Sequence, residues 1–312
     1  MMVQEDGARF ERAIAESLGF QKVFFGMTEN LEFLLGHFPP FEGKRVLSVA
    51  GSGDAPISFL QRGASVMGVD VTDAAIYWTA VKIACAEQLD SEDYCTVLNA
   101  LNPNQKRGYD FERAQRCIFD VELPGGPVDV KTFFSSEDSL REWRERFFIT
   151  TRYYGPELSP HSFVHPGPLS EGRLTLVRGD LFDQLEPLEF DHIHLSNILD
   201  YIFIRGSNIK YFADGVPDYS EMPNFTACPE REERMVRLRR LTESLREGGT
   251  ASSFTAAYFT PYTEMFITCG VEAGFGVECY EFPSPYHLQR GLKDLFINFK
   301  KQQYTYFFRY IK

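Results

Sequence analysis

Residues 44–54 of this chain, Lys-Arg-Val-Leu-Ser-Val-Ala-Gly-Ser-Gly-Asp, join a short apolar run to a turn with two glycines. The apolar run predicts a buried strand, and the glycines allow the backbone to turn sharply and to approach a ligand closely. A second apolar run ends at Asp70, near the spacing of about 20 residues at which an acid binds ribose hydroxyls. A nucleoside-binding βαβ unit requires these features in this order.

The glycine turn reads Gly-Ser-Gly-Asp and lacks the G-x-G-x-x-G pattern that cradles a pyrophosphate. We therefore expect a ligand with a ribose and no phosphates, of which S-adenosylmethionine (SAM) is the common one. In an open α/β sheet the ligand lies across the carboxyl ends of the strands. This rule selects the predicted SAM-binding residues, which are Gly51, Ser52, Gly53, Asp54, Asp70, Val71, Asp180, Leu181, Ser196 and Asn197.

Three acids receive separate roles in this prediction. Asp70 is expected to accept hydrogen bonds from both ribose hydroxyls, and Asp54 to hold the amino group of the methionyl chain, directly or through water. Asp180 is placed to accept from the adenine amine, with the Leu181 amide near the ring. The alternative for Asp180 is a helix cap before residues 182–185.

The predicted catalytic residues lie after the fourth strand and at the end of a helical insertion. The side-chain carbonyl of Asn197 would bind the ammonium group or orient an attacking amine, and Asp200 and Tyr201 would order or accept a proton. Tyr153 and Tyr154 would place phenol rings over the sulfonium, because aromatic faces attract cations. Capping and ordinary core packing are the alternative roles for these last four residues.

The order of predicted elements is that of an α/β protein. It resembles the class I SAM-methyltransferase (Rossmann-like) fold, a seven-stranded sheet whose last strand is antiparallel. We expect an N-terminal helical segment over 1–40 and a Rossmann-like SAM-binding domain over 41–312, with a helical cap insertion at about 90–172. The predicted strands are 45–50, 65–70, 174–177, 190–195, 250–258, 277–282 and 303–310. The predicted helices are 8–18, 29–37, 55–62, 72–88, 110–119, 136–148, 230–247 and 261–273. Thr72 and Asp73 are the expected caps of the helix that runs to 88, and Gly248-Gly249 is the expected stop of the helix over 230–247.

The composition limits the classes of partner that the chain is expected to bind. The chain carries 44 acidic against 32 basic residues and a net charge of −12, which argues against nucleic acid and anionic membranes. The basic residues of 231–246 alternate with glutamates, as on a solvated helix face. The 29 phenylalanines and 15 tyrosines indicate either a large aromatic core or an aromatic pocket for a cation.

The cysteines, the apolar runs and the histidines give expectations about the cellular compartment and about metal binding. The six cysteines form no C-x-x-C pair, which favours free thiols in a reducing compartment. No apolar run is long enough for a membrane span, and the N-terminus has no signal-peptide core, so we expect a cytoplasmic protein. His192 and His194 share one face of a predicted strand, but they have no recognisable third ligand, and no metal is expected.

Three segments together resemble a known group of enzymes. They are residues 25–30, residues 46–54 with Asp70 and Lys82, and residues 195–201. They are similar to the SAM-dependent 3-amino-3-carboxypropyl transferases related to betaine-lipid synthase, and to the SAM cyclases that form azetidine-2-carboxylate. In those transferases an acidic or amide residue, a lysine one helix after the ribose acid, and a Ser-Asn pair recur. The matching positions are Glu29-Asn30, Lys82 and Ser196-Asn197, which adds Asn30 to the SAM-binding set; a Trp expected within residues 28–30 is missing.

The resemblance implies chemistry at the γ-carbon of the methionyl chain, with methylthioadenosine as the leaving group. Either SAM's own amine attacks, giving azetidine-2-carboxylate, or a small molecule accepts the 3-amino-3-carboxypropyl group. A lipid acceptor fits poorly, because the chain lacks basic, apolar surface segments. A conventional small-molecule methyltransferase and a non-catalytic SAM-binding protein stay open, because a fold does not fix a function.

Overall fold

The computed structural model describes most of the chain between Leu35 and Lys312, together with Phe25. The described residues are 25, 35–38, 40–103, 108–148, 173–196, 198–199, 210–211, 217–218, 231–255, 260–283 and 304–312. The chain divides into two compact units, Met2–Leu181 and Phe182–Lys312, and each is described by itself.

The first unit contains three parallel strands and the helices that connect them. In β1 and β2, Val46 and Leu47 pair with Val66 and Met67, and β2 pairs in turn with β3. The helix α4 begins where the Thr72 side chain accepts a hydrogen bond from the Ala75 amide, so the predicted cap is present. The elements are β1 (Arg45–Val49), α3 (Asp54–Gln61), β2 (Ser65–Asp70), α4 (Asp73–Gln88) and β3 (Leu174–Arg178).

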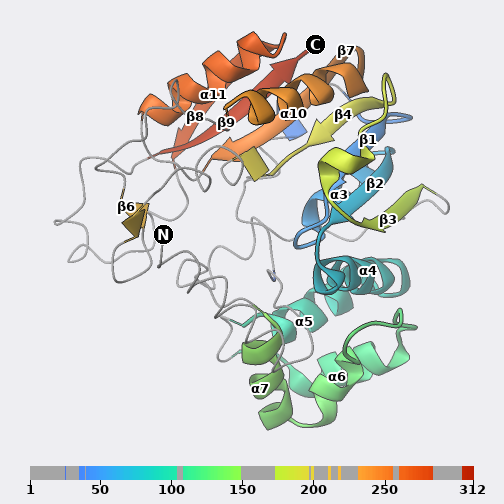
Figure 1. Ribbon diagram of the computed structural model, residues 1–312. Helices are drawn as coiled ribbons and strands as arrows, with labels where there is room; N and C mark the ends of the chain where they lie inside the picture. Colours follow the sequence, from blue (N-terminus) through green and yellow to red (C-terminus); the bar gives the residue numbers. More distant parts are fainter. Residues whose placement is uncertain are drawn as a thin grey trace. The chain divides into compact units, whose positions relative to one another are not determined.

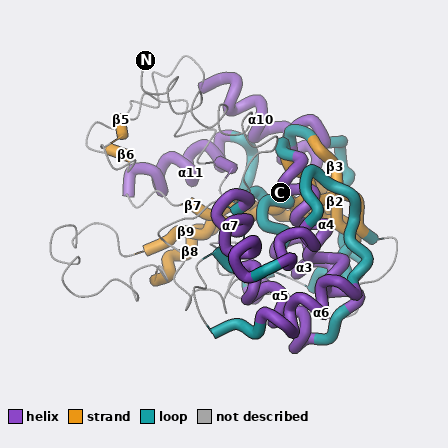
Figure 2. Tube along the Cα trace, turned by 90° about the horizontal axis from the view of Figure 1, so that it is seen from below, coloured by secondary structure: helices purple, strands orange, loops and turns teal. Residues whose placement is uncertain are grey.

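A group of short helices follows α4 in the same unit, and these helices lie together in both views (Figures 1 and 2). The helices are α5 (Ser91–Leu101), α6 (Phe111–Asp120), the 3-10 helix η1 (Val130–Ser135) and α7 (Glu137–Phe147). Each begins at an Asp or Ser whose side chain accepts a backbone hydrogen bond from the first turn. Two of them match the helices predicted over 110–119 and 136–148, and α5 was not predicted.

Aromatic side chains fill the core of this helical group. The Trp78 ring lies 4.8 Å from that of Phe148 and 6.4 Å from that of Phe147, centroid to centroid. Phe133, Phe134, Phe147 and Phe148 are fully buried. These phenylalanines therefore form core, which is the simpler of the two interpretations of the aromatic content.

The second unit carries the remaining strands. β4 runs parallel to β7, and β9 pairs antiparallel with both β7 and β8. The helices α10 and α11 pack on these strands (Figure 1). The elements are η2 (Leu181–Gln184), which begins at the last residue of the first unit, β4 (Phe190–His194), β5 (Lys210–Tyr211), β6 (Pro217–Asp218), α10 (Arg231–Ser244), β7 (Leu245–Thr255), α11 (Thr260–Glu272), β8 (Gly276–Pro283) and β9 (Tyr304–Ile311).

The seven long strands have the order β3-β2-β1-β4-β7-β9-β8. Counted along the chain, this order is 3-2-1-4-5-7-6, and the last strand is the antiparallel one. The predicted fold class, an α/β protein with the seven-stranded sheet of the class I SAM-methyltransferase fold, is confirmed by this topology.

One predicted boundary is wrong. Gly248-Gly249 does not end the helix before it, because α10 stops at Ser244 and β7 begins at Leu245. The register between β4 and β7 shifts there: Phe190 pairs with Leu245, but His192 pairs with Thr250. β7 therefore carries extra residues between these two pairs, and Gly248 among them has φ 71°, in the left-handed region that favours glycine.

No helix in the described part of the chain is both long and apolar enough to cross a bilayer. Among the described cysteines, Cys85, Cys95, Cys117, Cys269 and Cys279 are free thiols. Burial raises the pKa of Cys85 to about 12, so this thiol stays protonated at neutral pH.

Candidate functional site

The glycine turn between β1 and α3 is closed by backbone hydrogen bonds and by its contact with α4. Gly51 and Gly53 have φ of 49° and 86°, in the left-handed region. The Gly53 amide donates to the Ala50 carbonyl at 2.7 Å. A Cβ atom on Gly53 would lie 3.1 Å from the Thr79 Cα atom, so a larger residue would meet the α4 backbone.

The predicted ribose acid, Asp70, is held beside this turn. Its Oδ2 accepts from the Gly51 amide at 3.1 Å, and its Oδ1 accepts from the Thr72 amide and hydroxyl, both at 3.0 Å. Burial raises the pKa of Asp70, and the hydrogen bonds from Thr72 and Gly51 oppose that shift. Asp70 as a whole is only partly buried.

The neighbouring strand ends bring further predicted residues to the same edge. The Gly179 amide donates to the Asp70 carbonyl at 2.9 Å, which places Asp180 at the adjacent strand end, with Leu181 buried behind it. Val71 follows Asp70 directly and is 64% exposed, unusual for a large apolar side chain at a strand end. The carboxyl edge of β1, β2 and β3 therefore carries a backbone turn, an acid and an exposed apolar surface, a combination suited to a nucleoside.

A buried ion pair lies directly behind the glycine turn. The Lys82 Nζ atom is 2.7 Å from Asp54 Oδ1, and the Ser52 hydroxyl donates to Asp54 Oδ2 at 2.9 Å. The side chains of Lys82 and Asp54 are 0% and 1% exposed. Burial lowers the pKa of Lys82, and the Asp54 carboxylate opposes that shift. Asp54, predicted to hold an amino group of the ligand, thus holds the ammonium group of a lysine here.

Two aromatic rings complete the surroundings of this ammonium group. The Nζ atom lies 5.4 Å from the ring centroids of Phe25 and of Trp78, within the range of cation–π attraction. The Trp78 indole donates to the Phe25 carbonyl at 3.0 Å, which fixes the two rings together. We name Ser52, Asp54, Lys82, Phe25 and Trp78 the lysine cluster.

Sequence reasoning missed part of this arrangement. Thr72 was expected only as a helix cap, and it also holds Asp70; the signal was its position two residues after the acid. Trp78 had no predicted role. Lys82 was singled out by resemblance alone, and its charge partner, Asp54, lies 28 residues earlier in the chain.

The end of β4 carries Ser196, the one predicted site residue of the second unit that the structure describes. Its φ is 49°, and its carbonyl accepts from the Phe254 amide at 2.8 Å and the Ser253 hydroxyl at 3.0 Å. A non-glycine residue in the left-handed region marks a constrained backbone. The predicted residues that lie outside the described part of the chain are Asn30, Tyr153, Tyr154, Asn197, Asp200 and Tyr201.

The two histidines of β4 form a buried network with β7. Both rings contact the Ser252 hydroxyl, from His192 Nε2 at 3.1 Å and His194 Nδ1 at 2.9 Å, and His192 Nδ1 contacts the Thr250 hydroxyl at 2.9 Å. Burial lowers the pKa of His192 well below its ordinary value and that of His194 to about 3, so both are neutral. Within the described ranges, no three His, Cys, Asp or Glu side chains gather as metal ligands would.

Comparisons with known proteins add the following findings. No protein-family model matches the chain, and no curated protein matches it in sequence. Among solved structures, it is similar to a Listeria monocytogenes protein assigned as a SAM-dependent methyltransferase (10% identity, 91% of this chain and 97% of that chain, TM-score 0.42). It is also similar to a SAM-dependent methyltransferase of Mesorhizobium loti (12%, 90% and 96%, TM-score 0.41) and to a methyltransferase of Pyrococcus furiosus (13%, 100% and 99%, TM-score 0.36).

Proposed function

We propose that this protein is a SAM-dependent enzyme. The observation that carries the proposal is the hydrogen bond from the Gly51 amide to the Asp70 carboxylate at the carboxyl edge of the parallel strands. It joins a glycine turn without a pyrophosphate pattern to an acid suited to ribose hydroxyls, beside the exposed Val71. A nucleoside without phosphates fits this edge, and the ligand acts as a substrate. No metal takes part in the proposed reaction.

We further propose that the reaction takes place at the γ-carbon of the methionyl chain. The support is the resemblance to aminocarboxypropyl transferases and SAM cyclases, together with the lysine cluster. Phe25, Asp54 and Lys82 belong to separate stretches of the resembling segments, and they meet in one buried group behind the glycine turn. This convergence gives the resembling residues a common place beside the expected amino-acid end of SAM.

In the cyclisation, the unprotonated amine of SAM attacks its own γ-carbon. A carbon–nitrogen bond forms, the bond from the γ-carbon to sulfur breaks, and methylthioadenosine leaves with the electron pair. The ammonium formed on the ring releases a proton, which leaves azetidine-2-carboxylate. In the transfer reaction a small-molecule amine or alcohol replaces the internal amine. Because the sulfonium is already a good leaving group, the protein contributes mainly placement and an unprotonated nucleophile.

Methyl transfer to a small molecule is the second candidate. The strand order favours it, because the fold class is that of methyltransferases. The two reactions differ in their nucleoside product, which is methylthioadenosine after γ-carbon attack and S-adenosylhomocysteine after methyl transfer.

The test is incubation of the purified protein with SAM alone, followed by mass spectrometry. Methylthioadenosine together with azetidine-2-carboxylate supports the cyclase. If SAM is unchanged, a filtered cell extract supplies small-molecule acceptors, and the released nucleoside separates transfer from methylation. S-adenosylhomocysteine as the sole nucleoside product would overturn the proposal of γ-carbon chemistry. Intact SAM in both incubations would overturn the proposal that the protein is a SAM-dependent enzyme.

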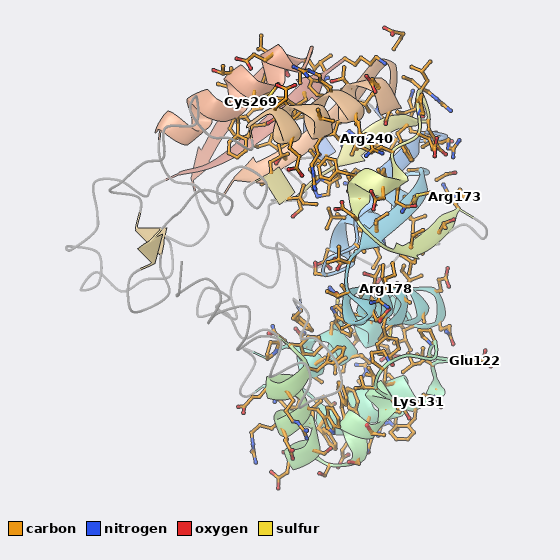
Figure 3. All side chains as sticks on the ribbon, viewed as in Figure 1. Glu122, Lys131, Arg173, Arg178, Arg240 and Cys269 are labelled. Atoms are coloured by element: carbon orange, nitrogen blue, oxygen red, sulfur yellow. The ribbon has the colours of Figure 1, made fainter. Side chains whose placement is uncertain are left out.

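A matched pair of variants links turnover to the site. Asp70→Ala removes the predicted ribose acceptor and is expected to abolish turnover. Asp73→Ala removes a neighbouring acid, 62% exposed, that pairs with Arg178 at the end of β3 (Figure 3), and it should retain turnover. Equal turnover of the two variants would contradict the proposed site.

A further inference from the structure

The lysine cluster has hydrogen-bonding capacity that the described protein groups do not use. A lysine ammonium group has three N–H donors. Of the residues that the structure describes, Asp54 is the one that accepts a hydrogen bond from Lys82. The flanking rings of Phe25 and Trp78 attract the charge without accepting a conventional hydrogen bond. Donors of a fully buried ammonium group are usually satisfied, so this group is suited to a further acceptor.

A second polar atom at the same place is independently unsatisfied. The Thr79 hydroxyl is fully buried and has no hydrogen-bond partner among the residues described. Thr79 lies three residues before Lys82 on α4, so both side chains are on the same helix face. A Cβ atom on Gly53 would lie 3.2 Å from the Thr79 Oγ1 atom, which locates the hydroxyl against the glycine turn. Two residues with unused donors therefore lie on one face of α4, next to the glycine turn.

The charges of the pair match the two ends of an amino acid. Asp54 offers a carboxylate, which suits an ammonium or amine, and Lys82 offers an ammonium group, which suits a carboxylate. The two groups lie 2.7 Å apart, so one α-amino acid group that displaces the groups covering them can contact both. Both side chains are closed off from solvent, and electrostatic contacts are stronger where water is excluded.

We propose that Lys82 binds the α-carboxylate of the ligand, so that the Asp54–Lys82 pair recognises its zwitterionic amino-acid end. The inference rests on the proposed function, because SAM is the nucleoside that carries such an end. The inference also explains how the methionyl chain of SAM would be oriented. A carboxylate bound at Lys82 and an amine bound at Asp54 fix both polar substituents of the α-carbon. The chain that leads to the γ-carbon then has a defined starting point.

The test compares the affinities of three nucleosides by isothermal titration calorimetry. SAM has the whole amino-acid end, decarboxylated SAM lacks only the carboxylate, and methylthioadenosine lacks the whole end. For the unaltered protein we expect SAM to bind at least tenfold more tightly than decarboxylated SAM, about 1.4 kcal/mol. In Lys82→Met, the affinity for SAM should fall to the affinity for decarboxylated SAM, and the affinity for methylthioadenosine should not change.

Further variants keep the test decisive if Lys82→Met folds poorly. The double variant Asp54→Asn/Lys82→Met has no unpaired buried charge and should also lose the discrimination. Asp54→Asn alone should weaken SAM and decarboxylated SAM by the same factor, because both ligands keep the amine. Lys131→Met is the control, since this exposed lysine of η1 bonds the Phe119 carbonyl in the helical group (Figure 3).

Two results would overturn the inference while the proposed function stands. One is equal affinity of the unaltered protein for SAM and decarboxylated SAM. The other is a uniform loss of affinity for all three nucleosides in Lys82→Met, the result of a purely structural lysine. If none of the three binds the unaltered protein, the proposed function itself is wrong, and this inference fails with it.

Discussion

Two buried polar clusters, one in each unit, solve the same physical problem in different ways. The lysine cluster keeps two formal charges away from water, and Asp54 accepts a hydrogen bond from one of the three N–H donors of Lys82. The histidine network of β4 and β7 carries no charge, and both ring nitrogens of His192 have hydroxyl partners. One cluster is charged, and the other is neutral.

The contrast separates a site from a structural element. Burying charge is costly, and an ion pair repays that cost only with good geometry and further hydrogen bonds. A cluster that retains charge beside the glycine turn is a candidate for function, whereas a neutral network between two strands stabilises their pairing. The four predictions below test this division, from the largest expected effect to the smallest.

Removing one partner of the buried ion pair should have the largest effect on stability. Lys82→Met leaves the Asp54 carboxylate buried without its counter-charge, which costs about 3–5 kcal/mol in the free energy of unfolding. The double variant Asp54→Asn/Lys82→Met should recover most of that loss, because no charge remains. Urea denaturation of both variants measures the difference. Equal destabilisation would show that the packing of the lysine, not its charge, matters.

Acidification should weaken the histidine network. The folded-state pKa of His194 is about 3 against an ordinary value of 6.5, so below pH 6.5 the unfolded chain binds the proton first. Stability should therefore fall as the pH drops from 6.5 toward 3, by about 1.4 kcal/mol per pH unit for this histidine. His194→Asn keeps a polar group near the Nδ1 position and cannot titrate. Urea denaturation at several pH values gives the free energy of unfolding against pH, and the slope of that plot for His194→Asn should be smaller by the equivalent of about one bound proton. An unchanged slope would contradict a neutral His194 in the folded protein.

Two serines allow a matched comparison of the clusters. Ser252→Ala removes the hydroxyl that both histidines contact, and it should cost about 1–3 kcal/mol in stability with no change in SAM affinity. Ser52→Ala removes a hydrogen bond to Asp54 and should lower the affinity for SAM. Thermal unfolding and calorimetric binding on the same samples distinguish the two. A loss of SAM affinity in Ser252→Ala alone would reverse the assignment of site and scaffold.

An exposed ion pair supplies the reference for the buried one. Arg146 and Glu142 on α7 are 3.0 Å apart, and their side chains are 42% and 65% exposed. Glu142→Gln should change the free energy of unfolding by about 0.5 kcal/mol or less, because solvent screens this pair. Urea denaturation of Glu142→Gln and of Lys82→Met under the same conditions compares the two changes in the free energy of unfolding. A change of several kcal/mol would mean that burial is not the cause of the difference.

Elements with local signals were predictable from the sequence. The strand expected over 65–70 appears with those bounds, and α4 begins at the capping Thr72 and runs to Gln88. The helix α5 had a comparable signal, since Asp90 caps it and its buried residues follow helical spacing. No helix was predicted there, although these signals are local.

Long-range features were less accessible. The rule that ligands bind at the carboxyl ends of parallel strands selected Gly51 and Asp70, which the structure joins by a hydrogen bond; their role toward a ligand stays a prediction. The register shift around Gly248-Gly249 depends on pairing with β4, whereas the two glycines taken alone predict the end of a helix. The Asp54–Lys82 pair depends on the packing of α4 behind the turn, and no local pattern reports which of many acids a lysine meets. The predicted catalytic residues outside the described ranges stay predictions.

The close approach of α4 to the glycine turn has an evolutionary consequence. With 3.1 Å between the Thr79 Cα atom and the Cβ position of residue 53, the obstacle is backbone, and no choice of side chain at position 79 removes it. A side chain at position 53 would therefore need both a strained φ of 86° and a shift of the α4 backbone by a few tenths of an ångström. Sequence change is less constrained at positions such as 71, whose side chain is exposed, than in the turn.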